Sequence, residues 1–176
     1  MADQSFTDAL NKQISNEFSA SQQYVGAAVY YDKETLPRLA AFFYRQAAEE
    51  RDHAMMMVRY LIDVDERVDL PQVDTAPCEF DGVAAPVQMA LEQEKRVGKE
   101  INALFELARD TKEYRAEQFL QWFVKEQVEE VALMTDLLNV VERAGDNPLR
   151  VEEYLAREQL GAATDDPTAP PIAGGG

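Results

Sequence analysis

The sequence has few of the residues that mark secreted or membrane proteins. Its one cysteine, Cys78, cannot form an internal disulfide, which fits a reducing cytoplasm. No apolar run approaches the length of a transmembrane helix, and the first residues lack the basic and apolar regions of a signal peptide. Glycine and proline number only 8 each among 176 residues. We therefore expect a cytoplasmic, mostly helical protein with a sizeable core and no membrane contact.

Positive charge is also scarce. With 17 basic and 33 acidic side chains, the formal net charge is −16. Such a surface repels phosphate backbones, so a nucleic-acid partner is not expected. It attracts cations, although many of the individual acids have no other role than to solvate the surface.

Four long segments carry apolar or small residues every three or four positions, which predicts helices with one buried face. They span about residues 3–34, 37–67, 83–110 and 113–144, and a short fifth helix is expected from about 147 to 160. Residues 161–176 show no periodicity and are expected to form a disordered tail. The predicted division is thus one domain over 1–160, followed by that tail.

The loop lengths predict how the helices connect. The first and second helices, and the third and fourth, are joined tightly and should be antiparallel neighbours. About 15 residues from Val68 to Gly82 separate the second helix from the third, and an extended loop of that length spans roughly 50 Å. The predicted fold is an all-α four-helix bundle with one long crossover between helices two and three.

Polar residues interrupt the apolar stripes near the middle of each long helix. They are Glu17 in the first helix, Glu50 and His53 in the second, Glu94 in the third, and Gln127 and Glu130 in the fourth. Since they lie near the helix midpoints, they should converge within roughly 5 Å along the bundle axis. His53 is the only histidine of the chain, and the Glu50–His53 step places both side chains on one helix face.

Buried carboxylates that face one another require compensation. An unpaired buried carboxylate costs too much desolvation energy, and four in one layer repel each other. A neutral hydrogen-bonded cluster or an arginine-paired network could also compensate them, but no arginine or lysine lies on these stripes near mid-height. We therefore predict a pair of divalent metal ions, and iron rather than zinc, because oxygen-rich ligands suit it.

The ligands predict two unequal metal sites. A di-iron carboxylate bundle takes one Glu from each of two helices and a Glu-x-x-His from each of the others. The second of these motifs reads Gln127-x-x-Glu130 here. One site would therefore use Glu17, Glu50 and His53, and the other Glu94, Glu130 and a bridging Glu50, with Gln127 outside the metal's direct ligands.

In these residues the chain resembles the haem-free bacterial ferritins over about residues 5–160. The matching positions are Glu17, Tyr24, Glu50, His53, Glu94, Gln127 and Glu130. The resemblance implies a ferritin-like bundle whose intrasubunit ferroxidase centre oxidises Fe(II) with O2 or H2O2. It also implies a homo-oligomeric shell of 24 subunits that stores iron as a ferric oxyhydroxide mineral.

The resemblance implies three further features. Glu49, Glu126 and Glu129, with Glu130, match a third iron site, although they could equally be solvated acids. Tyr24 and Trp122 resemble residues that donate electrons near the centre, and simple core packing is an equal alternative for Trp122. No haem is expected, because bacterioferritins ligate haem through a Met at the position that Arg51 occupies here.

Two other functions are also compatible with the sequence. The chain could be a different di-iron oxidase or peroxidase, which would need an apolar substrate pocket and no large shell. It could also be a non-catalytic storage or scaffold subunit, which would not bind iron tightly.

Overall fold

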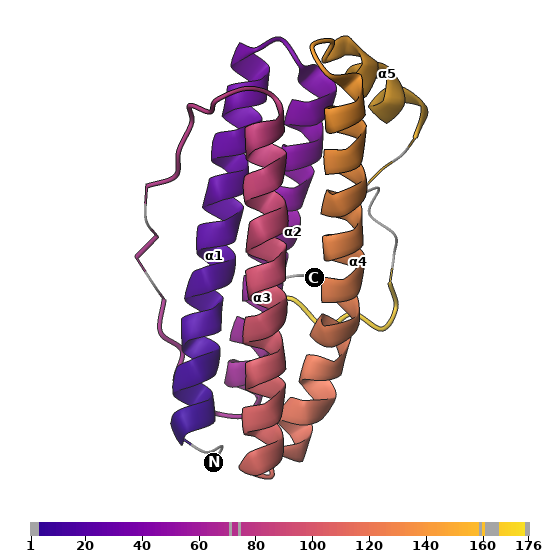
Figure 1. Cartoon of the computed structure of the whole chain (residues 1–176). Helices are drawn as coiled ribbons and strands as arrows, with labels where there is room; N and C mark the ends of the chain where they lie inside the picture. The colour runs from indigo at the N-terminus through magenta and orange to yellow at the C-terminus, as the bar shows by residue number, and fades with distance from the viewer. Residues whose placement is uncertain (1–3, 71, 74, 159, 161–165, 175–176) are drawn as a thin grey trace.

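The protein is described by a computed structural model that covers residues 4–70, 72–73, 75–158, 160 and 166–174. These residues form five helices and no strand, which confirms the predicted all-α fold (Figure 1). The helices are α1 (Gln4–Lys33), α2 (Pro37–Asp63), α3 (Ala84–Asp110), α4 (Tyr114–Ala144) and α5 (Leu149–Arg157). Within the described residues, none of the helices combines the length and apolarity that crossing a membrane requires.

The connections follow the predicted topology. α1 packs chiefly against α2, and α3 against α4, as expected for two antiparallel hairpins. The crossover runs the length of the bundle beside α1 (Figure 1). At one end Asn11 donates a hydrogen bond to the carbonyl oxygen of Arg67 at 2.9 Å, and at the other the Tyr31 hydroxyl donates to that of Val83 at 2.6 Å. Helix α3 therefore starts at the end of the bundle where α2 starts.

Two predicted helix ends are wrong by a few residues. α2 ends at Asp63, four residues before the expected end, because Asp65 takes the left-handed conformation with φ of 60°. The amide of Glu66 then donates to the carbonyl oxygen of Leu61 at 2.9 Å, which closes the helix. α5 likewise ends at Arg157 rather than near residue 160.

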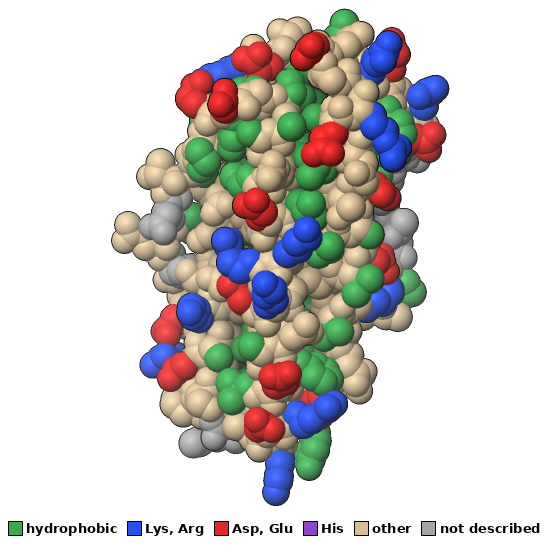
Figure 2. Space-filling view, viewed as in Figure 1, with side chains coloured by type: hydrophobic (Ala, Val, Ile, Leu, Met, Phe, Trp, Pro, Cys, Tyr) green, Lys and Arg blue, Asp and Glu red, His purple; other side chains and the backbone are tan. Residues whose placement is uncertain are grey.

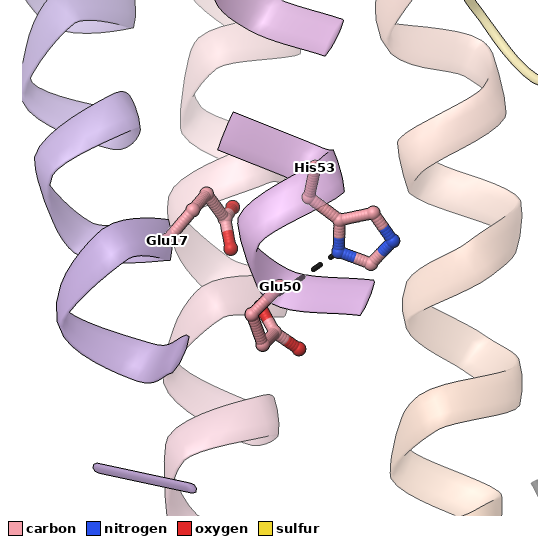
Figure 3. A group of neighbouring side chains, drawn as sticks. All are labelled: Glu17, Glu50 and His53. Atoms are coloured by element: carbon pink, nitrogen blue, oxygen red, sulfur yellow. Dashed lines mark ion pairs between the residues drawn. The ribbon is translucent and has the colours of Figure 1, made fainter. Parts of the chain in front are cut away.

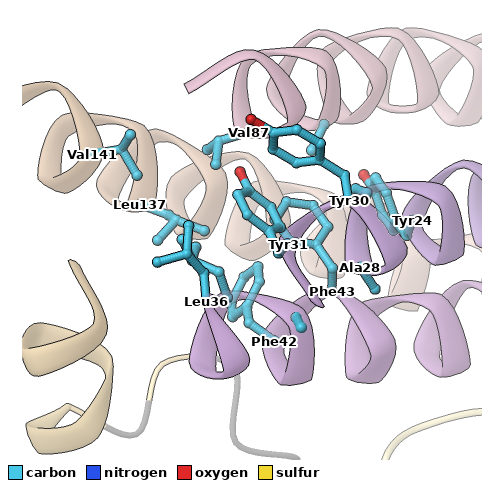
Figure 4. Close-up of a cluster of buried hydrophobic side chains, with 14 of the residues drawn as sticks. Tyr24, Ala28, Tyr30, Tyr31, Leu36, Phe42, Phe43, Val87, Leu137 and Val141 are labelled. Atoms are coloured by element: carbon cyan, nitrogen blue, oxygen red, sulfur yellow. The ribbon is translucent and has the colours of Figure 1, made fainter. Parts of the chain in front are cut away.

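The buried core consists of two apolar clusters at different heights of the bundle. The upper cluster includes Tyr24, Tyr31, Phe43 and Leu137 (Figure 4). The lower cluster is built around residues such as Leu10, Met57, Ile101 and Leu120. Each long helix contributes to both clusters, so the residues between its two contributions lie at mid-height.

The described part of the C-terminal tail lies against the bundle. Residues 166–174 contact α2 and α4, which differs from the disordered tail expected from the sequence. The rest of that tail, 161–165 and 175–176, lies outside the described residues.

Charged side chains of both signs are spread over the face shown in Figure 2, and no histidine is visible on it. This agrees with the burial of His53, which is 8% exposed.

Candidate metal centre

A layer of buried polar side chains separates the two apolar clusters. On α1 the lower cluster ends at Ile14 and the upper begins at Tyr24, with Glu17 between them. Each of the other long helices places its polar residues in the same interval. The buried carboxyl groups of this layer are those of Glu17, Glu50, Glu94 and Glu130. Four acids from four helices thus converge as the apolar stripes predict.

Glu17, Glu50 and His53 form the tightest group of this layer. One possible ligand atom from each lies within 4.8 Å of those from the other two, and all three side chains are buried. Figure 3 shows Glu17 reaching from α1 toward the two residues of α2. The Nδ1 atom of His53 lies 3.7 Å from Oε2 of Glu50. A carboxylate from each of two helices and an imidazole nitrogen suit a divalent transition metal.

Two aromatic rings of α4 surround the His53 imidazole. Trp122 and Phe123 each meet it edge to face, with ring centroids 5.6 Å and 5.8 Å away. These contacts restrict the orientation of the imidazole ring. The histidine ring is therefore oriented by α4 although it belongs to α2.

Glu94 is held by hydrogen bonds from two other helices. The hydroxyl of Tyr24 donates to its Oε1, and Nε2 of Gln127 donates to its Oε2 at 2.6 Å. Gln127 also donates to the backbone carbonyl oxygen of Glu94 at 3.0 Å. These contacts fix the carboxylate of Glu94. The side-chain amide nitrogen of Gln127 points at Glu94, and an amide nitrogen is a donor that cannot ligate a metal.

The electrostatics of the layer favour protonated acids when no cation is present. Burial, followed by the repulsion from Glu50, raises the pKa of Glu17 well above its usual value. Burial and the neighbouring Glu94 act in the same way on Glu50, whose pKa is also strongly raised. For Glu130, burial raises the pKa to about 8. A bound cation would replace these protons and remove the repulsion.

Unpartnered atoms in the layer fit a metal better than a neutral cluster. Oε2 of Glu17 and Oε2 of Glu130 are buried and have no hydrogen-bond partner among the described residues. Buried polar atoms are otherwise nearly always paired, so these two oxygens are candidates for metal ligands. An arginine-paired network is also absent from the described ion pairs of this layer.

The acids matched to a third iron site are less enclosed. Glu49 and Glu126 are half-buried and Glu129 is exposed. Gln46 donates a hydrogen bond to Glu49, and Lys125 pairs with Glu129 at 3.6 Å. Within the described residues, the group of three close ligand atoms does not include these acids.

Two buried glutamines that were not predicted from the sequence support the acids. Gln13 donates a hydrogen bond to Oε1 of Glu17 at 2.9 Å and is 2% exposed. Gln46 is 1% exposed and holds Glu49. Each lies one turn before a buried glutamate on the same helix face, four residues from Glu17 and from Glu50. That spacing is the signal that could have revealed them.

Together, the long crossover and the central layer of carboxylates and one imidazole define a helical bundle of the metal-binding carboxylate class. Residues 7–144 match the family model described as "Ferritin-like domain". The chain belongs to the ferritin family.

Relatives and solved structures agree with this assignment. The chain is 48% identical over 173 residues to "Ferritin BfrB" of Mycolicibacterium smegmatis, covering 98% of this chain and 95% of that protein. It is 34% identical to the "Bacterial non-heme ferritin" of Staphylococcus aureus, covering 94% and 99%. The "open pore ferritin" structure from Archaeoglobus fulgidus is similar with a TM-score of 0.85 and 32% identity, covering 89% and 98%.

Proposed function

We propose that this protein is an iron-storage ferritin that oxidises Fe(II) at a centre within each subunit. The observation that carries the proposal is the buried group of Glu17, Glu50 and His53, whose ligand atoms lie within 4.8 Å of one another. The bacterial relatives of this chain are themselves named ferritins.

Two Fe(II) ions, the substrate, would bind in the polar layer. The first would take Glu17, Glu50 and His53, and the second Glu94 and Glu130, with Glu50 bridging the two. The free Oε2 atoms of Glu17 and Glu130 support their roles as ligands. Gln127 would act outside the ligand set by holding Glu94 through its amide.

The chain's own residues would release protons and orient ligands. Because the pKa values of the acids are raised, Fe(II) binding should displace protons from Glu17, Glu50 and Glu130. Gln13 and Tyr24 would hold Glu17 and Glu94 in place. Each Fe(II) gives one electron to dioxygen or peroxide, and the two neighbouring sites allow both electrons to leave together.

Glu49, Glu126 and Glu129, with Glu130, would form a third iron site beside this centre. Burial raises the pKa of Glu49 and of Glu126, so cation binding would relieve an electrostatic cost there too. Lys125 would have to release Glu129 for that carboxylate to bind iron.

Storage would take place in a homo-oligomeric shell of 24 subunits. Large apolar side chains exposed on the isolated subunit, among them Ile62, Leu70 and Tyr114, support burial against further copies. The net charge of −16 favours attraction of Fe(II).

The protein would act in the cytoplasm, because the free thiol of Cys78 fits a reducing compartment.

The proposal is tested by repeated aerobic additions of Fe(II) to metal-free protein, followed by size-exclusion chromatography with iron analysis. Wild-type protein should elute as a large assembly that carries many iron atoms per subunit. The Glu50→Ala variant should assemble but oxidise iron slowly, whereas the exposed-acid control Glu142→Ala should match wild type. A monomeric protein, or one without retained iron, would refute the storage function.

A further inference from the structure

The C-terminal segment Asp166–Gly174 links α4 to α2 across the bundle at the height of the candidate centre. In Figure 1 it runs from the α4 side to the C-terminus at mid-height. Ala169, Ile172 and Ala173 pack against the lower apolar cluster. The amide of Ala173 donates a hydrogen bond to the carbonyl oxygen of Met55 at 3.2 Å. The segment is therefore attached to α2 two residues beyond His53.

At its other end the segment is attached to α4 through one carboxylate. The indole Nε1 of Trp122 donates a hydrogen bond to Oδ2 of Asp166 at 3.0 Å, and the ammonium of Lys125 lies 3.5 Å from the same oxygen. Oδ1 accepts hydrogen bonds from the amide and the hydroxyl of Thr168, at 2.8 Å and 2.6 Å. The contacts with Thr168 and Trp122 hold the pKa of Asp166 well below its usual range, so this carboxylate stays ionised.

Trp122 connects this carboxylate to the candidate centre. Its ring meets the His53 imidazole edge to face at 5.6 Å and packs at 90° against Phe123 at 5.0 Å. Phe123 contacts the same imidazole. An indole can rotate about its side-chain bonds, and the hydrogen bond to Asp166 selects one orientation. The C-terminal segment is therefore joined by one hydrogen bond to Trp122, whose ring packs against the candidate metal ligand His53.

We propose that Asp166–Gly174 is a strap across α2 and α4, and that Asp166 is a positioning residue that holds His53 through Trp122. The positioning role rests on the proposed ferroxidase function, whereas the strap itself does not. A segment that served only to cover the lower apolar cluster would need Ala169 and Ile172 but not an ionised group bonded to the indole. The ammonium of Lys125 adds an electrostatic attraction that also holds Asp166 against α4.

The chain offers a direct probe, because Trp122 is its only tryptophan. In iron-free, fully assembled protein, Asp166→Ala should shift the tryptophan emission to longer wavelength and increase its quenching by acrylamide. The matched control is Asp136→Ala, which replaces an exposed acid on α4, the helix that carries Trp122. It should leave the emission wavelength and the acrylamide quenching unchanged. Asp166→Asn keeps an oxygen that accepts from the indole and should restore most of the wild-type emission.

Rates of Fe(II) oxidation test the positioning role. We expect Asp166→Ala to lower the initial rate about three- to tenfold, less than the roughly 10- to 100-fold loss caused by removing a direct partner of a metal ligand, because Asp166 acts through Trp122. In a Trp122→Phe background, Asp166→Ala should cause no further loss, because both changes break the same connection. Asp166→Asn should recover most of the rate.

The fluorescence result decides whether the strap exists, and the oxidation rates decide whether Asp166 positions His53. Unchanged emission and quenching in Asp166→Ala would overturn the strap. Changed emission with an unchanged oxidation rate, or an equal loss in the Trp122→Phe background, would overturn the positioning role. If wild-type protein itself fails to oxidise Fe(II) rapidly, the proposed function fails, while the fluorescence comparison still decides whether the strap exists.

Discussion

The side-chain amide of Gln127 is hydrogen-bonded twice to Glu94, to the carboxylate at 2.6 Å and to the backbone carbonyl oxygen at 3.0 Å. The interaction joins α3 to α4 at the height of the candidate centre. A symmetric di-iron bundle would have the Glu of a second Glu-x-x-His motif at this position. This chain has Gln127 there, which orients the carboxylate of Glu94 without being a metal ligand itself.

Replacing Gln127 should therefore slow iron oxidation without preventing metal binding at the first site. Gln127→Leu removes both hydrogen bonds and frees the Glu94 carboxylate, so we expect the initial oxidation rate to fall about tenfold. Stopped-flow absorbance of the ferric product measures this rate. Gln118→Leu, at an exposed position of the same helix, is the control and should retain the wild-type rate. Equal rates for the two variants would contradict the role of Gln127.

The stability of the metal-free protein should fall as the pH rises, in part because of Glu130. Its pKa is about 8 in the folded protein, whereas an unfolded glutamate has a pKa of about 4.3. The folded state thus holds the proton more tightly, and this contribution is fully present below pH about 4 and lost as the pH rises toward about 8. Glu130→Gln keeps the volume and removes the titration, so it should stabilise the metal-free protein at pH 8 by on the order of a few kcal/mol.

Thermal unfolding of both metal-free proteins at pH 5 and pH 8 checks this expectation. The difference between Glu130→Gln and wild type should grow with pH, while the exposed control Glu142→Gln should follow wild type. A constant difference at both pH values would show that Glu130 does not titrate in this range.

Gly26→Ala should destabilise the protein although alanine is the better helix former. A methyl group at Gly26 would overlap the carbonyl oxygen of Pro77, a backbone atom of the crossover. We expect a loss of about 1–3 kcal/mol, typical of overpacking. Chemical denaturation measures it, with Gln22→Ala, exposed on the same helix, as the control. A stabilised Gly26→Ala variant would mean that the crossover does not approach α1 here.

Haem should not bind to this chain. The residue after Glu50 is Arg51, which is exposed and pairs with Asp52 at 3.3 Å, so this position offers no thioether ligand. Protein purified from haem-replete cells should show no Soret band. A strong band that persists after gel filtration would contradict this expectation.

The sequence predicted the fold and much of the centre because both depend on helix periodicity. The interruptions at Glu17, Glu50 and Glu94 identified buried acids since apolar residues flank each of them one turn away. The end of α2 was not predictable, because Asp65 is one of the few non-glycine residues in the left-handed conformation.

The docked tail could not be predicted for a different reason. Its attachment depends on single contacts between residues far apart in the chain, such as Trp122 with Asp166, and these leave no periodic pattern. The pairing of Lys125 with Asp166 also depends on this tertiary arrangement, whereas its pairing with Glu129 lies within α4 at the i,i+4 spacing.

The most direct test of the central claim is the stoichiometry of fast iron oxidation. Metal-free wild-type protein is mixed aerobically with increasing Fe(II), and the ferric absorbance is followed beside His53→Ala. We expect a fast phase that saturates at about two Fe(II) per subunit and is lost in the variant. Slow oxidation at the same rate in both proteins would contradict this claim.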